Sequence, residues 1–371
     1  MEMINEGSDE DDYKEDVSYG SKVRSMLENA RQMIASKLQP APRSFMIADK
    51  QETEDKNGTL KEVQQMEQPL LDLPIQELIG DPFHARRLEE CLAPGEDETQ
   101  LDFYSKISRV EQLDSWDCGI ACLLMILRWA QVDSTTRSAT AETPNHLGHS
   151  HAMSDEESQQ YRNLCTAIDS ESIWTADLVF QLDSLFEDIP SIRYLFCSKT
   201  FEVENDYKDI GYYQAAFGRD QQRVSAIFDQ LLTHWPNHLH RTRGGLSLNT
   251  VLNAVCHSNC IALVLVDNAI LRRKLAYQDS LTGETSSYVG HYVILCGITR
   301  DPDHLQAAIA FDHGENGEVG QTNQQRDAEF CVVLCDPGQG NPRWYFVTPN
   351  RFERARRANG TDEDIIFFAK S

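Results

Sequence analysis

The chain has 371 residues, 40% of them hydrophobic, and a formal net charge of −25. This length and apolar content can bury the core of one large domain or two small ones, with tails to spare. Such an excess of acidic residues argues against binding to nucleic acid or to anionic membranes, both of which attract Lys/Arg patches. We therefore expect neither as a partner.

The N-terminal region does not have the pattern of a secretory signal. Residues 1–20 are acidic, with neither the basic start nor the apolar stretch of a secretory signal. No apolar run approaches the length of about 20 residues that spans a bilayer. Ten cysteines lie at irregular spacings, mostly within apolar stretches, as is typical of reduced, buried thiols. We expect a soluble protein of the cytosol or nucleus.

The domain organisation follows from changes in composition along the chain. Residues 1–68 are mostly acidic or polar and are predicted to be mostly disordered, although residues 21–36 have apolar residues at helical spacing and could form a short amphipathic helix. Residues 69–100 are ambiguous and could form short helices or a linker. Residues 101–371 are predicted to be one folded domain. It has polar stretches near 133–170 and 301–328 that are too long for ordinary connections and are interpreted as insertions.

Within this domain, helices are followed by strands. Asp117 precedes the strongly apolar run CGIACLLMILRWAQ, which predicts a helix capped by that aspartate. Amphipathic helices are predicted at 172–186, 223–235 and 246–256, and strands at 191–200, 261–268, 290–299, 308–313, 329–338 and 343–349. This order favours the α+β class, with a helix packed on an antiparallel sheet.

One cysteine stands where thiol chemistry would need it. Cys118 begins the apolar helix, and the partial positive charge of a helix N-terminus stabilises a thiolate, which is the reactive form of cysteine. Gly119 follows and is expected to leave the approach to the sulfur uncrowded. Gln112 lies six residues upstream, where its amide could donate to a developing oxyanion beside the backbone N–H of Cys118.

Two later segments supply the partners of such a nucleophile. His291 follows a glycine at the start of the strand GHYVILCGIT, where an imidazole could act as general base and acid. Asp336 follows the strand CVVLC and precedes Pro337, where a carboxylate could orient that imidazole.

These segments resemble a known family. Gln112, the CGIAC helix, GHYV at a strand and DP after the next strand are similar to the C39 family of cysteine peptidases, which implies a papain-like fold. The segments WDCGIACLLMILR, GHYVILCGI and FERARRANGTDEDIIF more closely resemble the eukaryotic family named guanylyl cyclase domain-containing protein 1, over roughly residues 107–368. The C39 resemblance assigns catalytic roles to Gln112, Cys118, His291 and Asp336.

The sequence departs from the C39 pattern in two respects. The stretch between the His291 strand and the Asp336 strand is longer than in most C39 domains, so Asp312 within it is a rival orienter. C39 domains also commonly cut double-glycine leaders while fused to transporters, and no transporter is present here. That substrate is therefore not carried over.

Three functions remain open. The main prediction is an enzyme, a thiol hydrolase that cleaves peptide or amide bonds without a cofactor. The first alternative, implied by the family name, is a guanylyl cyclase that makes cyclic GMP from GTP with Mg²⁺ or Mn²⁺. The second is an inactive module that binds peptides in the same cleft. We find no phosphate-binding glycine loop and no spacing typical of zinc ligands, and we therefore expect no metal site.

Overall fold

The computed structural model describes residues 73–79, 107–131, 153–210, 214, 217–257, 259–272, 277–278, 285–286, 288–313, 329–340 and 343–371. All of them belong to one compact unit, Glu67–Ser371. The prediction of disorder for residues 1–68 lies outside the described residues. Of the ambiguous stretch 69–100, the described part is a helix, α2 (Leu73–Ile79), whose Ile75, Leu78 and Ile79 side chains are buried in the core of this unit. The folded unit therefore includes residues upstream of position 101.

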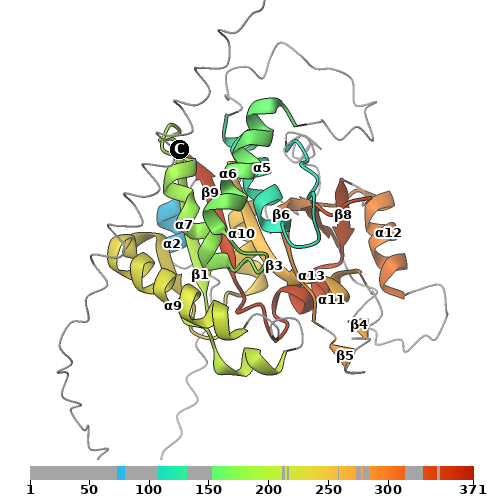
Figure 1. Cartoon of the computed structure of the whole chain (residues 1–371). Coiled ribbons are helices and arrows are strands. Elements are labelled where there is room, and N and C mark those ends of the chain that lie inside the picture. The colour runs from blue at the N-terminus through green and yellow to red at the C-terminus, as the bar shows by residue number, and fades with distance from the viewer. Residues whose placement is uncertain are drawn as a thin grey trace, which may run out of the picture. The chain divides into compact units, whose positions relative to one another are not determined.

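A seven-stranded sheet organises the unit (Figure 1). Its neighbouring strands pair antiparallel except at one edge, where β1 and β2 are parallel. The predicted α+β class is thus confirmed, with one parallel pair that the sequence did not predict. In spatial order the strands are β2 (Leu239–Arg241), β1 (Ile192–Ser198), β9 (Ile365–Lys370), β3 (Cys260–Asp267), β6 (Gly290–Thr299), β7 (Cys331–Cys335) and β8 (Trp344–Val347). A separate two-stranded sheet contains β4 (Tyr277–Gln278) and β5 (Thr285–Ser286).

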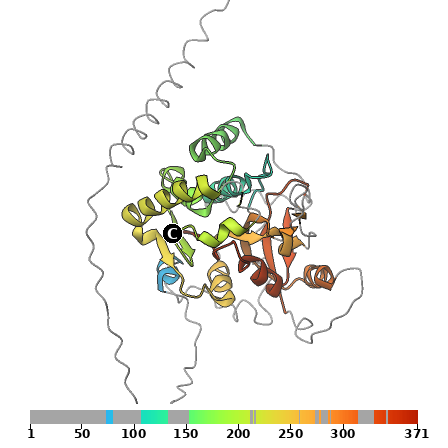
Figure 2. The same ribbon diagram turned by 60° about the horizontal axis from the view of Figure 1, so that its bottom comes forward.

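Helices cover both faces of the sheet, and Figure 2 shows the resulting layers. This is why β3 and β7 are buried along their whole length and, apart from Asp267 at the end of β3, are apolar with no polar alternation. The first face carries α5 (Cys118–Gln131), α6 (Asp155–Ile168), α7 (Thr175–Leu185) and α9 (Phe217–His234). The second face carries α2, α10 (Leu248–Val255), α11 (Asn268–Arg272) and α13 (Pro349–Arg356). The other helices in the described part of the chain are α12 (Pro302–His313), η3 (Asn205–Asp209) and η4 (Pro236–His238).

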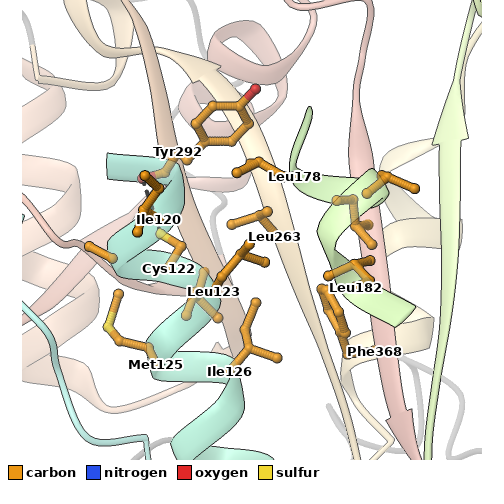
Figure 3. Packing of buried hydrophobic residues seen from close by; sticks show 14 of the residues in the cluster. Ile120, Cys122, Leu123, Met125, Ile126, Leu178, Leu182, Leu263, Tyr292 and Phe368 are labelled. Atoms are coloured by element: carbon orange, nitrogen blue, oxygen red, sulfur yellow. Dashed lines mark hydrogen bonds between the residues drawn. The ribbon is translucent and has the colours of Figure 1, made fainter. Parts of the chain in front are cut away.

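Helix α5 is the central helix of the first face. Twelve of its residues are buried, as expected for a helix that is apolar on all sides. Figure 3 shows its side chains together with Leu178 of α7, Leu263 of β3 and Tyr292 of β6. Each fully buried Leu or Ile contributes roughly 1.5–3 kcal/mol of transfer free energy. The start of α5 is therefore held firmly against the sheet.

Two predicted elements differ from the structure. The proposed insertion at 133–170 contains α6, which packs on α5 and is capped by Ser154 and Glu157 in a capping box. Residues 308–313 form the end of helix α12, although AIAFDH reads as an alternating strand. The Asp301 side chain starts that helix by accepting from the backbone N–H groups of Asp303 (2.9 Å) and His304 (3.0 Å).

None of the helices in the described residues combines the length and the apolar character needed to cross a bilayer.

Candidate functional site

Cys118 is the first residue of α5 and is 5% exposed. The helix begins here because the Asp117 carbonyl accepts the first intrahelical bond, from the Ala121 N–H at 3.1 Å. The Cys118 sulfur accepts from the backbone N–H of Tyr292 in β6, at 3.5 Å. The thiol thus lies between the positive end of a helix and the strand that carries His291, as the sequence predicted.

His291 is the second residue of β6 and is 6% exposed. Its Nε2 lies 3.0 Å from Oδ1 of Asp336, which leaves Nδ1 as the nitrogen that can serve the Cys118 thiol. Burial lowers the pKa of His291, but the Cys118 sulfur and the hydrogen bond to Asp336 outweigh it and raise the pKa to about 9. The site thus favours a protonated imidazole.

Asp336 directly follows β7 and is fully buried. The backbone N–H of Gly338 donates to its Oδ1 at 2.7 Å, and Arg109 Nε donates to its carbonyl oxygen at 2.8 Å. Burial raises the pKa of this carboxyl. The hydrogen bond and charge of His291, followed by the Arg272 guanidinium, lower it well below its ordinary value. Asp336 is therefore ionised at neutral pH.

Asp312, the rival orienter, lies elsewhere. Its carboxylate accepts hydrogen bonds from Thr348 Oγ1 and Arg351 Nε, which ties the end of α12 to the start of α13. Of the two aspartates, the structure places Asp336 against the imidazole.

Gln112 borders the Asp336 loop. Its backbone N–H donates to the Pro337 carbonyl at 2.9 Å, and its own carbonyl accepts from Gln339 Nε2 at 2.9 Å. The side-chain Nε2 donates to the Asp114 carbonyl at 2.6 Å, while the buried Oε1 has no hydrogen-bond partner among the described residues. One of the two amide hydrogens is therefore committed to the local turn. The structure brings His291 and Asp336 into direct contact and places the Cys118 sulfur against the backbone N–H of Tyr292, the residue after His291. Gln112 lies on the segment that adjoins the Asp336 loop.

Asp117 and Gly119 have roles other than the helix cap and the open approach that the sequence predicted. The Asp117 carboxylate accepts from the backbone N–H groups of Leu113 (3.2 Å) and Asp114 (3.1 Å) and from the Tyr161 hydroxyl, so it shapes the preceding turn. A Cβ on Gly119 would lie 2.9 Å from Leu178 Cδ1 and 3.1 Å from Tyr292 Cδ2. Gly119 therefore permits close packing of α5 on α7 and β6, whereas the sequence suggested an open approach to the sulfur.

Most of the folded unit is similar to known proteins. Residues 107–368 match the model of a family described as guanylylate cyclase. The chain belongs to this family. It is 25% identical over 263 residues to guanylyl cyclase 1 of Arabidopsis thaliana, an alignment that covers 70% of this chain and 74% of that protein. These descriptions favour the cyclase alternative of the sequence analysis, and neither mentions a peptidase or hydrolase.

The cyclase alternative would use divalent cations. Within the described residues, no group of three or more His, Cys, Asp or Glu side chains is arranged to hold a metal ion. Cys118 and Cys122 are both free thiols.

The sequence did not identify the charged neighbours of the site. Arg272, at the end of α11, forms an ion pair with Asp336 Oδ2. Arg109 also donates to the Gly338 carbonyl, and Glu111 balances its charge at 2.9 Å. The local signal for Arg272 is its place as a basic residue in the last turn of α11, and that signal does not indicate which carboxylate it binds.

Proposed function

We propose that the chain is a thiol-dependent hydrolase of peptide or amide bonds. The observation that carries this proposal is the buried contact between His291 Nε2 and Asp336 Oδ1, 3.0 Å long, beside a cysteine at a helix N-terminus. A papain-like fold of the C39 type accords with it, because the nucleophile's helix packs on the antiparallel strands that carry the base and its orienter.

In the proposed reaction, the Cys118 thiolate attacks the carbonyl carbon of the scissile bond. His291 then donates its proton to the leaving nitrogen, and the carbon–nitrogen bond breaks to give a thioester. Water, deprotonated by His291, hydrolyses the thioester and restores the thiol. Asp336 holds the imidazole throughout with the ring nitrogen that faces the sulfur free to exchange the proton.

The proposed oxyanion site combines the backbone N–H of Cys118 with the second amide hydrogen of Gln112. The first amide hydrogen is bound to the Asp114 carbonyl, and the Gln112 backbone is held by Pro337 and Gln339. This fixed setting favours a preorganised donor. Removing one such donor typically lowers kcat by about 100- to 1,000-fold, so Gln112→Ala should lose turnover but keep thiol reactivity.

The test is cleavage of a mixed synthetic peptide library by the purified full chain, followed by mass spectrometry. We expect new termini with wild type and none with Cys118→Ala or His291→Ala. Cys122→Ala is the matched control, because Cys122 is a buried thiol one helical turn further along α5. Cleavage that survives Cys118→Ala would overturn the proposal. Bound but uncut peptides, with an unreactive Cys118, would favour the inactive binding module.

A second candidate, guanylyl cyclase activity, is favoured by the family match. Its test is incubation of the same protein with GTP and Mg²⁺ or Mn²⁺, followed by measurement of cyclic GMP. Cyclic GMP formation that persists in Cys118→Ala and is lost on mutating an acidic pair would establish the cyclase and place its site away from the thiol. Cyclic GMP at background with both ions would leave the thiol site as the better explanation.

A further inference from the structure

Asp336 is shared by two basic groups. Its Oδ1 contacts His291 Nε2 at 3.0 Å and the Gly338 N–H at 2.7 Å, while its Oδ2 is bound by Arg272 Nη2. The Arg272 side chain is 9% exposed and Asp336 is fully buried, so solvent screens this ion pair little. The orienting carboxylate therefore has a second, permanent counter-ion.

Arg272 is fixed by the fold. It ends α11, which follows directly on β3, and its guanidinium carbon lies 5.5 Å from the centre of the Tyr345 ring. Arg351 of α13 donates to the carbonyl of the preceding residue, Leu271, at 3.5 Å. Because these elements belong to the core of the second face, the guanidinium is held in place before any substrate arrives.

The charge balance around His291 follows from this arrangement. We propose that Arg272 is a positioning residue that neutralises Asp336, so that Cys118 supplies the counter-charge for a protonated His291. The other charged groups near the ring do not take that role. Asp267, at the end of β3, accepts from the N–H groups of Ala269 and Val289, and burial raises its pKa. Arg109, from the segment before α5, is balanced by Glu111.

The pKa of His291 accords with this geometry. After burial, which lowers it, the charge of Cys118 is the largest influence that raises it, and the charge of Asp336 ranks below the hydrogen bonds. An imidazolium paired mainly with the thiolate loses its stabilisation when that thiolate is consumed.

This inference rests on the proposed function and gives Arg272 a role in it. When Cys118 Sγ forms its bond to the substrate carbonyl, the sulfur's negative charge passes to the carbonyl oxygen. His291 then faces an aspartate already neutralised by Arg272, so its proton moves to the leaving nitrogen as the carbon–nitrogen bond breaks. Arg272 thus ties proton release to nucleophilic attack.

The experiment is an NMR titration of His291 in the ¹⁵N-histidine-labelled full chain. Its signal is identified among the eleven histidines by its loss in His291→Gln. We expect Cys118→Ala to lower the pKa of His291 by about 1 to 3 units, the effect of removing one nearby opposite charge. In the Cys118→Ala background, Arg272→Gln should raise the pKa of His291 again, because the Asp336 carboxylate then lacks the Arg272 counter-ion and acts on the imidazolium with its full charge. Arg272→Lys, which keeps the charge, should leave it near the value of Cys118→Ala.

Two results would overturn the inference. One is a His291 pKa that stays near 9 in Cys118→Ala, since Asp336 would then be the counter-charge. The other is a further fall on adding Arg272→Gln, which a merely structural role predicts because the carboxylate would be misplaced. If Arg272→Gln does not fold, Cys118→Ala alone still decides. The titration needs no substrate, so failure to find a cleaved peptide would not affect it.

Discussion

A comparison of substitutions at Asp312 and Asp336 is the sharpest test of this site. The sequence offered both as orienters, and the structure separates them. Asp312 is 7% exposed and binds Arg351, which is 1% exposed and lies over the Phe311 ring at 4.7 Å. Asp312→Ala removes the Asp312 carboxylate from this buried ion pair.

The magnitude follows from burial. Removing one partner of a buried ion pair typically costs about 3–5 kcal/mol, because the remaining charge is uncompensated. Domains of this kind have unfolding free energies of roughly 5–15 kcal/mol, so the variant should still fold. Asp312→Ala combined with Arg351→Met should recover part of the loss, since it removes both charges of the pair.

The assay has two parts. Urea unfolding measures the free energy of unfolding, and mass spectrometry measures the rate at which iodoacetamide labels Cys118 near neutral pH. We expect Asp312→Ala to be destabilised but labelled at the wild-type rate below its unfolding transition. Asp336→Asn should be labelled more slowly, because the imidazole loses its orienter. Slowing of the Asp312→Ala reaction to the same degree would refute the assignment.

The remaining predictions concern packing and pH. Gly119→Ala should lower the free energy of unfolding by about 1–3 kcal/mol, because its Cβ would lie 2.9 Å from Leu178 and overpack the contact between α5 and α7. This cost should exceed the gain in helix propensity, and thermal melts would measure the difference. Burial raises the pKa of Asp177 to about 6, above its unfolded value, so this carboxyl contributes stability at low pH that is lost as pH rises from about 4 to 6. Urea unfolding at those two pH values should show that the free energy of unfolding of Asp177→Asn rises relative to that of wild type as the pH rises. The same difference in free energy of unfolding at both pH values would contradict the prediction.

Local signals in the sequence predicted much of the site. Cys118, His291 and Asp336 each stand at the boundary of a strongly apolar element, next to Asp117, Gly290 and Pro337 respectively. Such boundaries can be recognised from a single stretch of sequence. In an antiparallel sheet the start of one strand lies beside the end of its neighbour. That is why three distant segments could be placed together before their pairing was seen.

Features that depend on long-range packing could not be predicted in this way. Arg272 meets Asp336 because α11 and β7 are brought together by the sheet, and no local pattern encodes that pairing. Helix α6 was missed because only Tyr161, Leu164 and Ile168 of its residues are buried, which leaves it looking like a polar insertion. The error at α12 has another cause, since its capping Asp301 precedes the stretch that was read as a strand.

The two candidate functions make opposite demands on charge at this site. Holding the phosphates of GTP needs free positive groups, whereas thiol chemistry needs a thiolate balanced by one imidazolium. Arg272 is bound to Asp336, and Arg109 is bound to Glu111 and to two backbone carbonyls. These guanidiniums serve protein acceptors, so a cyclase of this family would have to take its phosphate and metal ligands from other residues. The thiol site would then be separable from cyclic GMP formation, and Cys118→Ala, measured in both assays, is the one variant that tests this separation directly.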